Sequence, residues 1–194
     1  EPKLTNGTYT KLKHKTGTQT IESYKRYLDT TEAGDSIRYL EIFFKDQYWK
    51  VFRYKIINGK PHILGIQREY NPDGNVTTEL YCGLSEKKCK FYKEYYYFMG
   101  GSLAHEGYYY DGKQDSTHIY YYKNGQIRQR RTYDKIKLVT VHEYNREDGT
   151  PLEIGTFKDG NGDLNVYSLN GRLIEIRTYV NGRKRKTRKA KDLF

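Results

Sequence analysis

Histidines and carboxylates are the first candidates for chemistry in this chain, and their spacing is unsuited to it. None of the histidines has a spacing typical of metal ligands, and the motif His-Glu-x-x-His does not occur. On an extended strand, the neighbours His105 and Glu106 would point to opposite faces. The run Asp115-Ser116-Thr117-His118 has the residue types of a hydrolase triad but lacks the glycines of a nucleophile elbow. We therefore expect no catalytic residue, no cofactor and no metal. The histidines considered are His14, His62, His105, His118 and His142.

The two cysteines, Cys82 and Cys89, leave two interpretations open. Neighbouring strands of a meander would allow them to form a disulfide, and two unpaired thiols fit the sequence equally well. Two thiols with no histidine nearby in the sequence are too few ligands for a zinc site.

Basic residues are concentrated at the end of the numbered chain, in a run that holds Arg183, Lys184, Arg185, Lys186, Arg188, Lys189 and Lys191. Residues 183–194 contain these seven bases and one acid, so without them the net charge falls by six, from +11 to +5. Such a run binds phosphates of nucleic acid or anionic lipid, or it is a solvated end. A second basic patch holds Arg128 and Arg130, which we expect on one strand face, and Arg131, which we expect on the other.

A repeat organises most of the chain: a Tyr, a Gly four residues later, and an aromatic residue eight positions after that. Repeats of this kind build a fold by stacking one small unit on the next. The clear copies are Tyr97…Gly101…Tyr109, Tyr121…Gly125…Tyr133 and Tyr167…Gly171…Tyr179. Two imperfect copies are Tyr70…Gly74…Tyr81, which is one residue short, and Tyr144…Gly149…Phe157, which has one extra residue in its turn.

Each repeat reads as a β-hairpin, because its glycine lies in a turn signature. Asn-Gly and Asp-Gly pairs form tight turns between antiparallel strands, since both residues tolerate positive φ. We expect positive φ at Gly125 and Gly171, and we expect Arg172–Val180 to be the last strand. The first turns are Asp73-Gly74, Gly100-Gly101, Asn124-Gly125, Asp148-Gly149 and Asn170-Gly171. A second set between repeats is Asp111-Gly112, Asp159-Gly160 and Asn181-Gly182.

The sequence therefore predicts an all-β fold, an elongated antiparallel meander of about a dozen strands joined by turns. With 22 tyrosines among 194 residues and a mean hydropathy of -0.99, the chain has too little aliphatic material for a thick sandwich. A single-layer sheet suits tyrosine, whose ring buries apolar area while its hydroxyl stays in water. The tyrosine clusters are then packing residues, with base stacking or ligand binding as the alternative.

Residues 1–67 follow the repeat less well. Tyr39–Phe44 and Tyr48–Ile57 are predicted strands, and Asp29–Ser36 is predicted to be a loop. The helical spacing of Ile21, Tyr24 and Leu28 suggests a short helix. This part is either a divergent set of hairpins or a cap that shields the first repeat. The expected organisation is 1–67 as this divergent part, 68–182 as hairpin repeats, and 183–194 as a basic tail.

The pattern Tyr121-Tyr122-Lys123-Asn124-Gly125…Tyr133 resembles the MORN-repeat variant of bacterial YwqK-like proteins, and Tyr167…Gly171…Tyr179 matches it equally well. The resemblance covers about Tyr70 to Gly182. The repeats lack the Trp and the His-Gly step of the better-known MORN repeat. The resemblance implies a single-layer sheet and a protein-binding, antitoxin-like or immunity-like role, since YwqK-like proteins often stand beside toxins. It carries over no catalytic residue.

Three functions remain open. The first is a non-enzymatic protein-interaction module that binds another protein through a Tyr-rich face containing Tyr121, Tyr133, Tyr167 and Tyr179. The second is a binder of anionic lipid or nucleic acid through the basic run, and the third is a cell-envelope structural or carbohydrate-contacting protein. No run approaches the roughly 20 apolar residues of a membrane-spanning helix, and no signal peptide is visible in the numbered chain. A bacterial protein, cytoplasmic or exported, fits the sequence, which determines neither the compartment nor the oligomeric state.

Overall fold

The computed structural model describes the backbone of residues 8–16, 19–32, 35–44, 47–57, 60–63, 65–82 and 90–190, and the side chains of residues 66–81 and 90–190. The regular elements in these ranges are fifteen β-strands, and the pairings described between them are all antiparallel. The predicted all-β hairpin meander is therefore confirmed. The chain divides into two compact units, residues 1–92 and 93–194.

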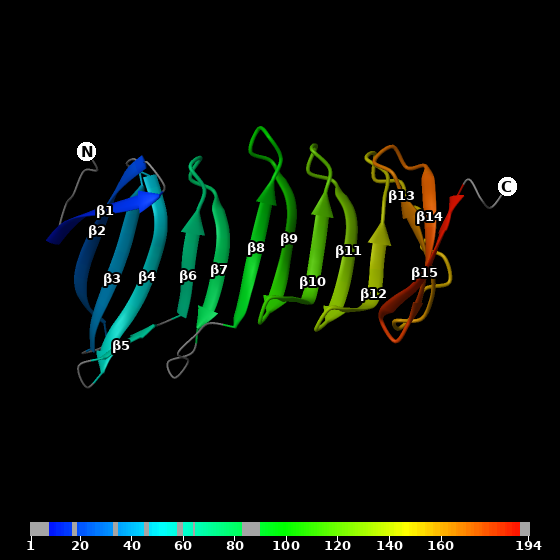
Figure 1. Cartoon of the computed structure of the whole chain (residues 1–194). Helices are drawn as coiled ribbons and strands as arrows, with labels where there is room; N and C mark the ends of the chain where they lie inside the picture. The colour runs from blue at the N-terminus through cyan, green and yellow to red at the C-terminus, as the bar shows by residue number, and fades with distance from the viewer. Residues whose placement is uncertain are drawn as a thin grey trace. The chain divides into compact units, whose positions relative to one another are not determined.

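In the first unit the strands pair in the order β1-β2-β3-β4-β6-β7, with β5 beside β4. Two of them, β3 and β4, cover the strands predicted over 39–44 and 48–57. Figure 1 labels the strands of this unit, which are β1 (Thr8–Thr16), β2 (Gln19–Glu32), β3 (Asp35–Phe44), β4 (Gln47–Ile57), β5 (Lys60–Ile63), β6 (Gly65–Tyr70) and β7 (Val76–Cys82).

Two expectations for this unit are wrong. The segment with helical spacing, Ile21 to Leu28, lies inside β2, and the loop expected over Asp29–Ser36 is largely strand. The reason is that β2 pairs with both β1 and β3 over most of its length, so tertiary pairing overrides a weak local period. The pairing state of Cys82 and Cys89 lies outside the described residues.

The second unit begins within β8 (Phe91–Tyr97). From there β8, β9 (Leu103–Tyr110), β10 (Lys113–Tyr121), β11 (Ile127–Asp134) and β12 (Lys137–Tyr144) follow one another in one sheet. A second sheet holds β13 (Gly162–Tyr167), β14 (Leu173–Val180) and β15 (Arg183–Lys189) in that order (Figure 1).

The hairpin turns are of two kinds. In the Asn-Gly and Asp-Gly pairs of the first set, only the glycine has positive φ: Gly125 at 85° and Gly171 at 76°, as predicted. In the pair Gly100-Gly101 of the same set, both residues have positive φ. The Gly125 N–H donates to the Tyr122 carbonyl at 3.0 Å, and the Tyr122 N–H donates to the Gln126 carbonyl at 2.9 Å. This is a four-residue turn closed by a glycine bulge.

The second set does place both residues at positive φ, as at Asp111 (48°) and Gly112 (77°). One repeat later, the corresponding turn between β11 and β12 has no glycine. Lys135 and Ile136 occupy it at φ 44° and 78°, and the Ile136 side chain is 60% exposed. Positive φ is strongly unfavourable for a β-branched residue, so this turn is strained. The Ile136 N–H donates to the Gln114 carbonyl at 2.7 Å, which helps to hold the turn in place.

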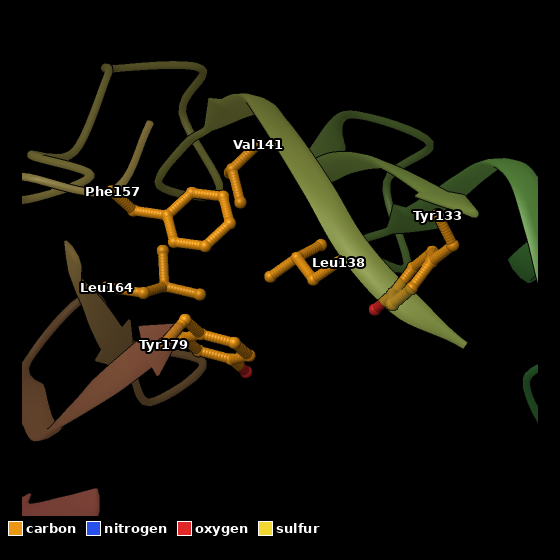
Figure 2. Packing of buried hydrophobic residues seen from close by; sticks show 6 residues of the cluster. All are labelled: Tyr133, Leu138, Val141, Phe157, Leu164 and Tyr179. Carbon is orange, nitrogen blue, oxygen red and sulfur yellow. The ribbon is translucent and has the colours of Figure 1, made fainter. Parts of the chain in front are cut away.

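The imperfect repeat Tyr144…Gly149…Phe157 interrupts the meander. After its turn the chain forms only isolated bridges, Asn145↔Pro151, Gly155↔Leu164 and Lys158↔Asn161, instead of a strand. Gly155 turns here at φ 94°. This irregular path brings Phe157 into an apolar core with residues of β11, β12, β13 and β14. Figure 2 shows its members, which are Tyr133, Leu138, Val141, Phe157, Leu164 and Tyr179.

The expectation that Arg172–Val180 is the last strand is wrong. Asn181 and Gly182 both have positive φ, so they form a tight two-residue turn that returns the chain along β14. The basic run that follows pairs with β14 from Val180↔Arg183 to Glu175↔Lys189. Basic side chains tolerate a strand at a sheet edge because their charged ends stay in water.

Candidate functional site

The best-defined polar cluster of the second unit starts from an irregularity in β10. Ser116 has φ 52°, and the register with β9 shifts between Asp115 and His118. Asp115 therefore lies opposite Tyr108, while His118 lies opposite Gly107. The bulge sends the His118 side chain onto the sheet face that also carries His105 and Tyr120.

Gly107 makes room for the His118 ring. A Cβ atom at Gly107 would lie 2.2 Å from Nδ1 of His118, so the ring lies directly against the β9 backbone. The edges of Tyr109 and Tyr133 close around it, with ring centroids 5.1 and 5.0 Å from that of His118. His118 is consequently 0% exposed, although the described residues include no helix that could cover the sheet.

The hydrogen bonds of His118 determine its tautomer. Its Nε2 lies 2.8 Å from the Tyr108 carbonyl oxygen, which can only accept, so Nε2 carries the proton. In the neutral ring Nδ1 is then an acceptor. His105 Nε2 lies 3.1 Å from that atom and donates to it. The two histidines thus form a directed chain, from His105 to His118 to the backbone of β9.

Both imidazoles are held neutral. Burial, the neighbouring His118 and the Arg128 charge lower the pKa of His105 to about 4, against a smaller opposite effect of Glu106. Burial also lowers the pKa of His118, with the Arg131 charge acting in the same direction. The bond to the Tyr108 carbonyl acts the other way but does not compensate. Burial likewise raises the pKa of Tyr120 to about 12.

His105 is also the centre of a ladder of stacked planar groups, defined here as Tyr96, His105, Tyr120 and Arg128, one from each of β8 to β11. The His105 ring stacks on Tyr120 at 4.3 Å and 18°, and on Tyr96 at 5.4 Å and 28°. The Arg128 guanidinium lies 5.7 Å from the Tyr120 ring centroid, within the range of a cation–π contact. The outer ring, Tyr96, is 50% exposed.

The opposite face of the same strands carries ion pairs. Lys93 lies 2.6 Å from one oxygen of Glu106, and the Tyr121 hydroxyl donates to the other at 2.7 Å. Burial acts to raise the pKa of the Glu106 carboxyl, but these two hydrogen bonds outweigh it and hold that pKa below its usual value. Burial and the neighbouring Glu106 raise the pKa of Tyr121 to about 12. His105 and Glu106 thus face opposite ways, as predicted.

The tyrosines predicted to bind a partner fall into two groups. Tyr133 and Tyr179 are 9% and 8% exposed and belong to the apolar core, so they offer little surface for docking. Tyr121 is half-buried and bonded to Glu106. Tyr167 donates its hydroxyl hydrogen to the Glu153 carbonyl at 2.7 Å, and its ring contacts Tyr144 edge to face. The structure does not bring the four together as one exposed patch.

The basic run also falls into two groups, one with acidic partners and one without. Arg188 pairs with Asp163, and Lys189 lies 3.3 Å from Glu175, which also binds Arg177. Burial acts to raise the pKa of Glu175, and the two cations outweigh it and hold that pKa below its usual value. In the described part of the chain, the exposed residues Arg183, Lys184, Arg185 and Lys186 have no acidic partner within ion-pair distance. Lys191 lies outside the described residues.

The prediction for the arginines of β11 is wrong. Tyr121 lies opposite Ile127 and Tyr120 opposite Gln129, so a bulge at this point shifts the register by one residue. Arg128 therefore reaches the Tyr120 ring, whereas Arg130 pairs with Glu143 at 2.9 Å. A single bulge is enough to separate two residues that a regular strand would place on one face.

Sequence reasoning missed the importance of Gly107 and His118. A signal was present, because a glycine inside a strand, away from any turn, often marks a close backbone approach. Which ring approaches depends on the bulge at Ser116, and a pattern of residue types does not show it. Among the residues that the structure describes, no group of three or more His, Cys, Asp or Glu could hold a metal ion.

No model of a known protein family matches this chain, and no curated protein matches it in sequence. The resemblance to YwqK-like proteins therefore stays a prediction. Within the described residues no helix has the length and apolar character needed to cross a membrane.

Proposed function

We propose that this chain is a non-enzymatic protein-interaction module that docks a partner protein on the ladder face of β8–β11. The ladder supports this most directly: its tyrosine, histidine and arginine groups are held rigid by stacking, and its outer ring, Tyr96, is half exposed. Tyr and Arg, together with Trp, are enriched at binding hot spots. Rigid rings lose little conformational entropy on binding.

The histidines support binding rather than catalysis. A general base works best with a pKa near the working pH, whereas burial lowers the pKa of His105 to about 4. The ring of His118 is enclosed, with both nitrogens occupied by His105 and Tyr108. In this proposal the pair stiffens the sheet under the ladder. The antitoxin-like or immunity-like role implied by the resemblance is the form of protein binding that we propose.

The test compares the parent chain with Tyr96→Ala and Tyr110→Ala. Tyr110 is a matched control: it is 39% exposed on the neighbouring strand and follows Tyr109, so it points to the opposite face. Immobilised proteins are used to capture partners from extracts of the source cells, and the affinity of the recovered protein is then measured. We expect Tyr96→Ala to weaken binding by about tenfold or more, the effect of a hot spot, and Tyr110→Ala to leave it unchanged.

Equal losses in both variants, or a loss only in Tyr110→Ala, would reject the ladder as the docking face. If the parent retains no protein above the matrix background but binds glycans in an array, the carbohydrate-contacting alternative takes its place. Co-expression with the product of an adjacent toxin-like gene tests the immunity-like role, because a bound antitoxin should restore growth.

A further inference from the structure

The edge strand β15 carries a run of four consecutive exposed cations, residues 183–186, with no acidic partner among the residues whose side chains are described. It lies at the end of the order β13-β14-β15, with β14 as its one neighbour among the described strands. On its outer side every second residue therefore points its N–H and C=O groups away from the sheet. Six of its seven residues are basic.

The charges of β15 are unevenly balanced along its length. At its end, Arg188 and Lys189 are bound to Asp163 and Glu175. At its start, Arg183 to Lys186 are all exposed and have no acidic partner among the described residues. The register with β14 shifts here: Lys184 lies opposite Tyr179 and Lys186 opposite Thr178, so Arg185 is the extra residue of a bulge. Lys184 and Lys186 therefore project on opposite sides of the sheet, and Arg183 projects on the side of Lys186.

We propose that β15 binds an extended acidic segment of a partner protein, which adds to the sheet as a further strand. An added strand places its side chains directly opposite those of β15, about 4.5–5.5 Å away, on both faces. Consecutive Asp or Glu residues would then meet the cations on both sides, while the backbone groups of the edge receive partners. The inference rests on the proposed function for the class of partner, a protein, but it uses a surface separate from the ladder.

The same geometry argues against other occupants. A second copy of β15 would set a run of cations against a run of cations, and like charges directly opposite one another are destabilising. Nucleic acid and anionic lipid offer negative charge, but they have no alternating N–H and C=O groups to pair with the edge. A polyanion would therefore use the charges of β15 and leave its backbone groups to water.

The decisive test uses the intact chain and a fluorescent peptide with a run of glutamates between valine and threonine residues. A second peptide has the same sequence and charge but is methylated at every second backbone nitrogen, on the edge that would face β15. We expect the methylated peptide to bind about tenfold more weakly or worse, because several strand hydrogen bonds are lost. On binding the unmodified peptide, amide hydrogen exchange in residues 183–189 should slow.

A pair of matched charge variants completes the test. Lys184→Glu with Lys186→Glu should weaken binding of the unmodified peptide by about tenfold or more, whereas Lys113→Glu with Lys123→Glu should leave it unchanged. Both pairs replace exposed lysines and change the net charge equally, and circular dichroism verifies that each variant is folded. Fluorescence anisotropy of the peptide measures binding, and about 0.15 M salt in the buffer screens unspecific attraction between charges.

If both peptides bind alike and a single-stranded oligonucleotide or anionic vesicles compete as well as the peptide, the edge proposal is overturned in favour of a general anionic surface. Absence of peptide binding also overturns it. Neither result touches the proposed function, because Tyr96 and the rest of the ladder are intact in every sample and partner capture is measured separately.

Discussion

Two clusters of the second unit bury side chains by different means. Around His118 the buried group is polar: a ring of 0% exposure lies on a glycine, and both nitrogens are hydrogen-bonded. Around Leu164, also 0% exposed, the buried groups are apolar and come from both sheets of the unit. In Figure 2, Phe157, Leu164 and Tyr179 lie on one side of this apolar cluster and face Leu138 and Val141 on the other.

The comparison shows what one layer of sheet can and cannot bury. Within one sheet a flat ring is covered by neighbouring rings only if the backbone below has no side chain, and its polar atoms must be satisfied. An aliphatic core needs a second surface opposite the first. The irregular segment after Gly149 supplies that surface, because it leads the chain into β13–β15.

The largest effect is expected in the apolar cluster. Leu164→Ala removes a fully buried side chain between the two sheets and should lower the free energy of unfolding by about 2–5 kcal/mol. Urea denaturation measures the loss. The exposed Leu169, at 64%, provides the control, and Leu169→Ala should cost about 0.5 kcal/mol or less. Similar losses in the two variants would mean that this cluster is not a core.

The next effect is at Gly107. The methyl group of Gly107→Ala would overlap the His118 ring, which must shift and lose one of its hydrogen bonds, so we expect a loss of about 1–3 kcal/mol. In the double variant with His118→Ala the overlap is absent. The double variant should therefore lose much less stability than the sum of the losses in the two single variants. Simple additivity would show that the ring does not lie on Gly107.

Acid should weaken the histidine cluster selectively. The pKa values of His105 and His118 are lowered in the folded chain, so their neutral forms favour folding above the unfolded value of about 6.5. This contribution is lost as the pH falls from about 6.5 towards about 4, the folded pKa of His105. A proton on His118 Nδ1 would also face the donor of His105. Melting temperatures of the parent should therefore fall over this range, and those of His105→Gln should fall less.

The control for this pH experiment is His142→Gln. It removes an exposed imidazole that is hydrogen-bonded to Thr132 on another part of the sheet. It should keep the pH dependence of the parent. If His105→Gln and His142→Gln shift the pH profile equally, the buried pair is not its source.

The smallest effect should be a gain. Ile136→Gly places glycine at φ 78°, where a β-branched residue is strained, and the side chain that it removes is 60% exposed. We expect stabilisation of about 0.5–1 kcal/mol, the relief of left-handed strain less the added entropy of the unfolded chain. The reciprocal change Gly112→Ile, in the matching turn, has open space around it and should destabilise through φ alone. Calorimetry would measure both.

The sequence by itself determined the features of this protein that depend on a few adjacent residues. The turn pairs and the Tyr…Gly…aromatic period specified hairpins, because turn geometry depends on a few adjacent residues. The positive φ of Gly125 and Gly171 follows from the same rule. So does the turn at Asn181-Gly182, which the Asn-Gly pair predicts, although the pattern does not predict that β15 follows it.

The tertiary structure decided what depends on register and on distant partners. A bulge at Ser116 chose the face of His118, and another at Tyr120/Tyr121 separated Arg128 from Arg130. The irregular segment after Gly149 brings Phe157 into the apolar core that contains Tyr133 and Tyr179, so these two tyrosines are buried and not surface residues as predicted. One inserted residue reverses every side chain that follows it, and its position is set by the balance of all the pairings around it. That balance is a property of the folded chain, which a pattern of residue types does not contain.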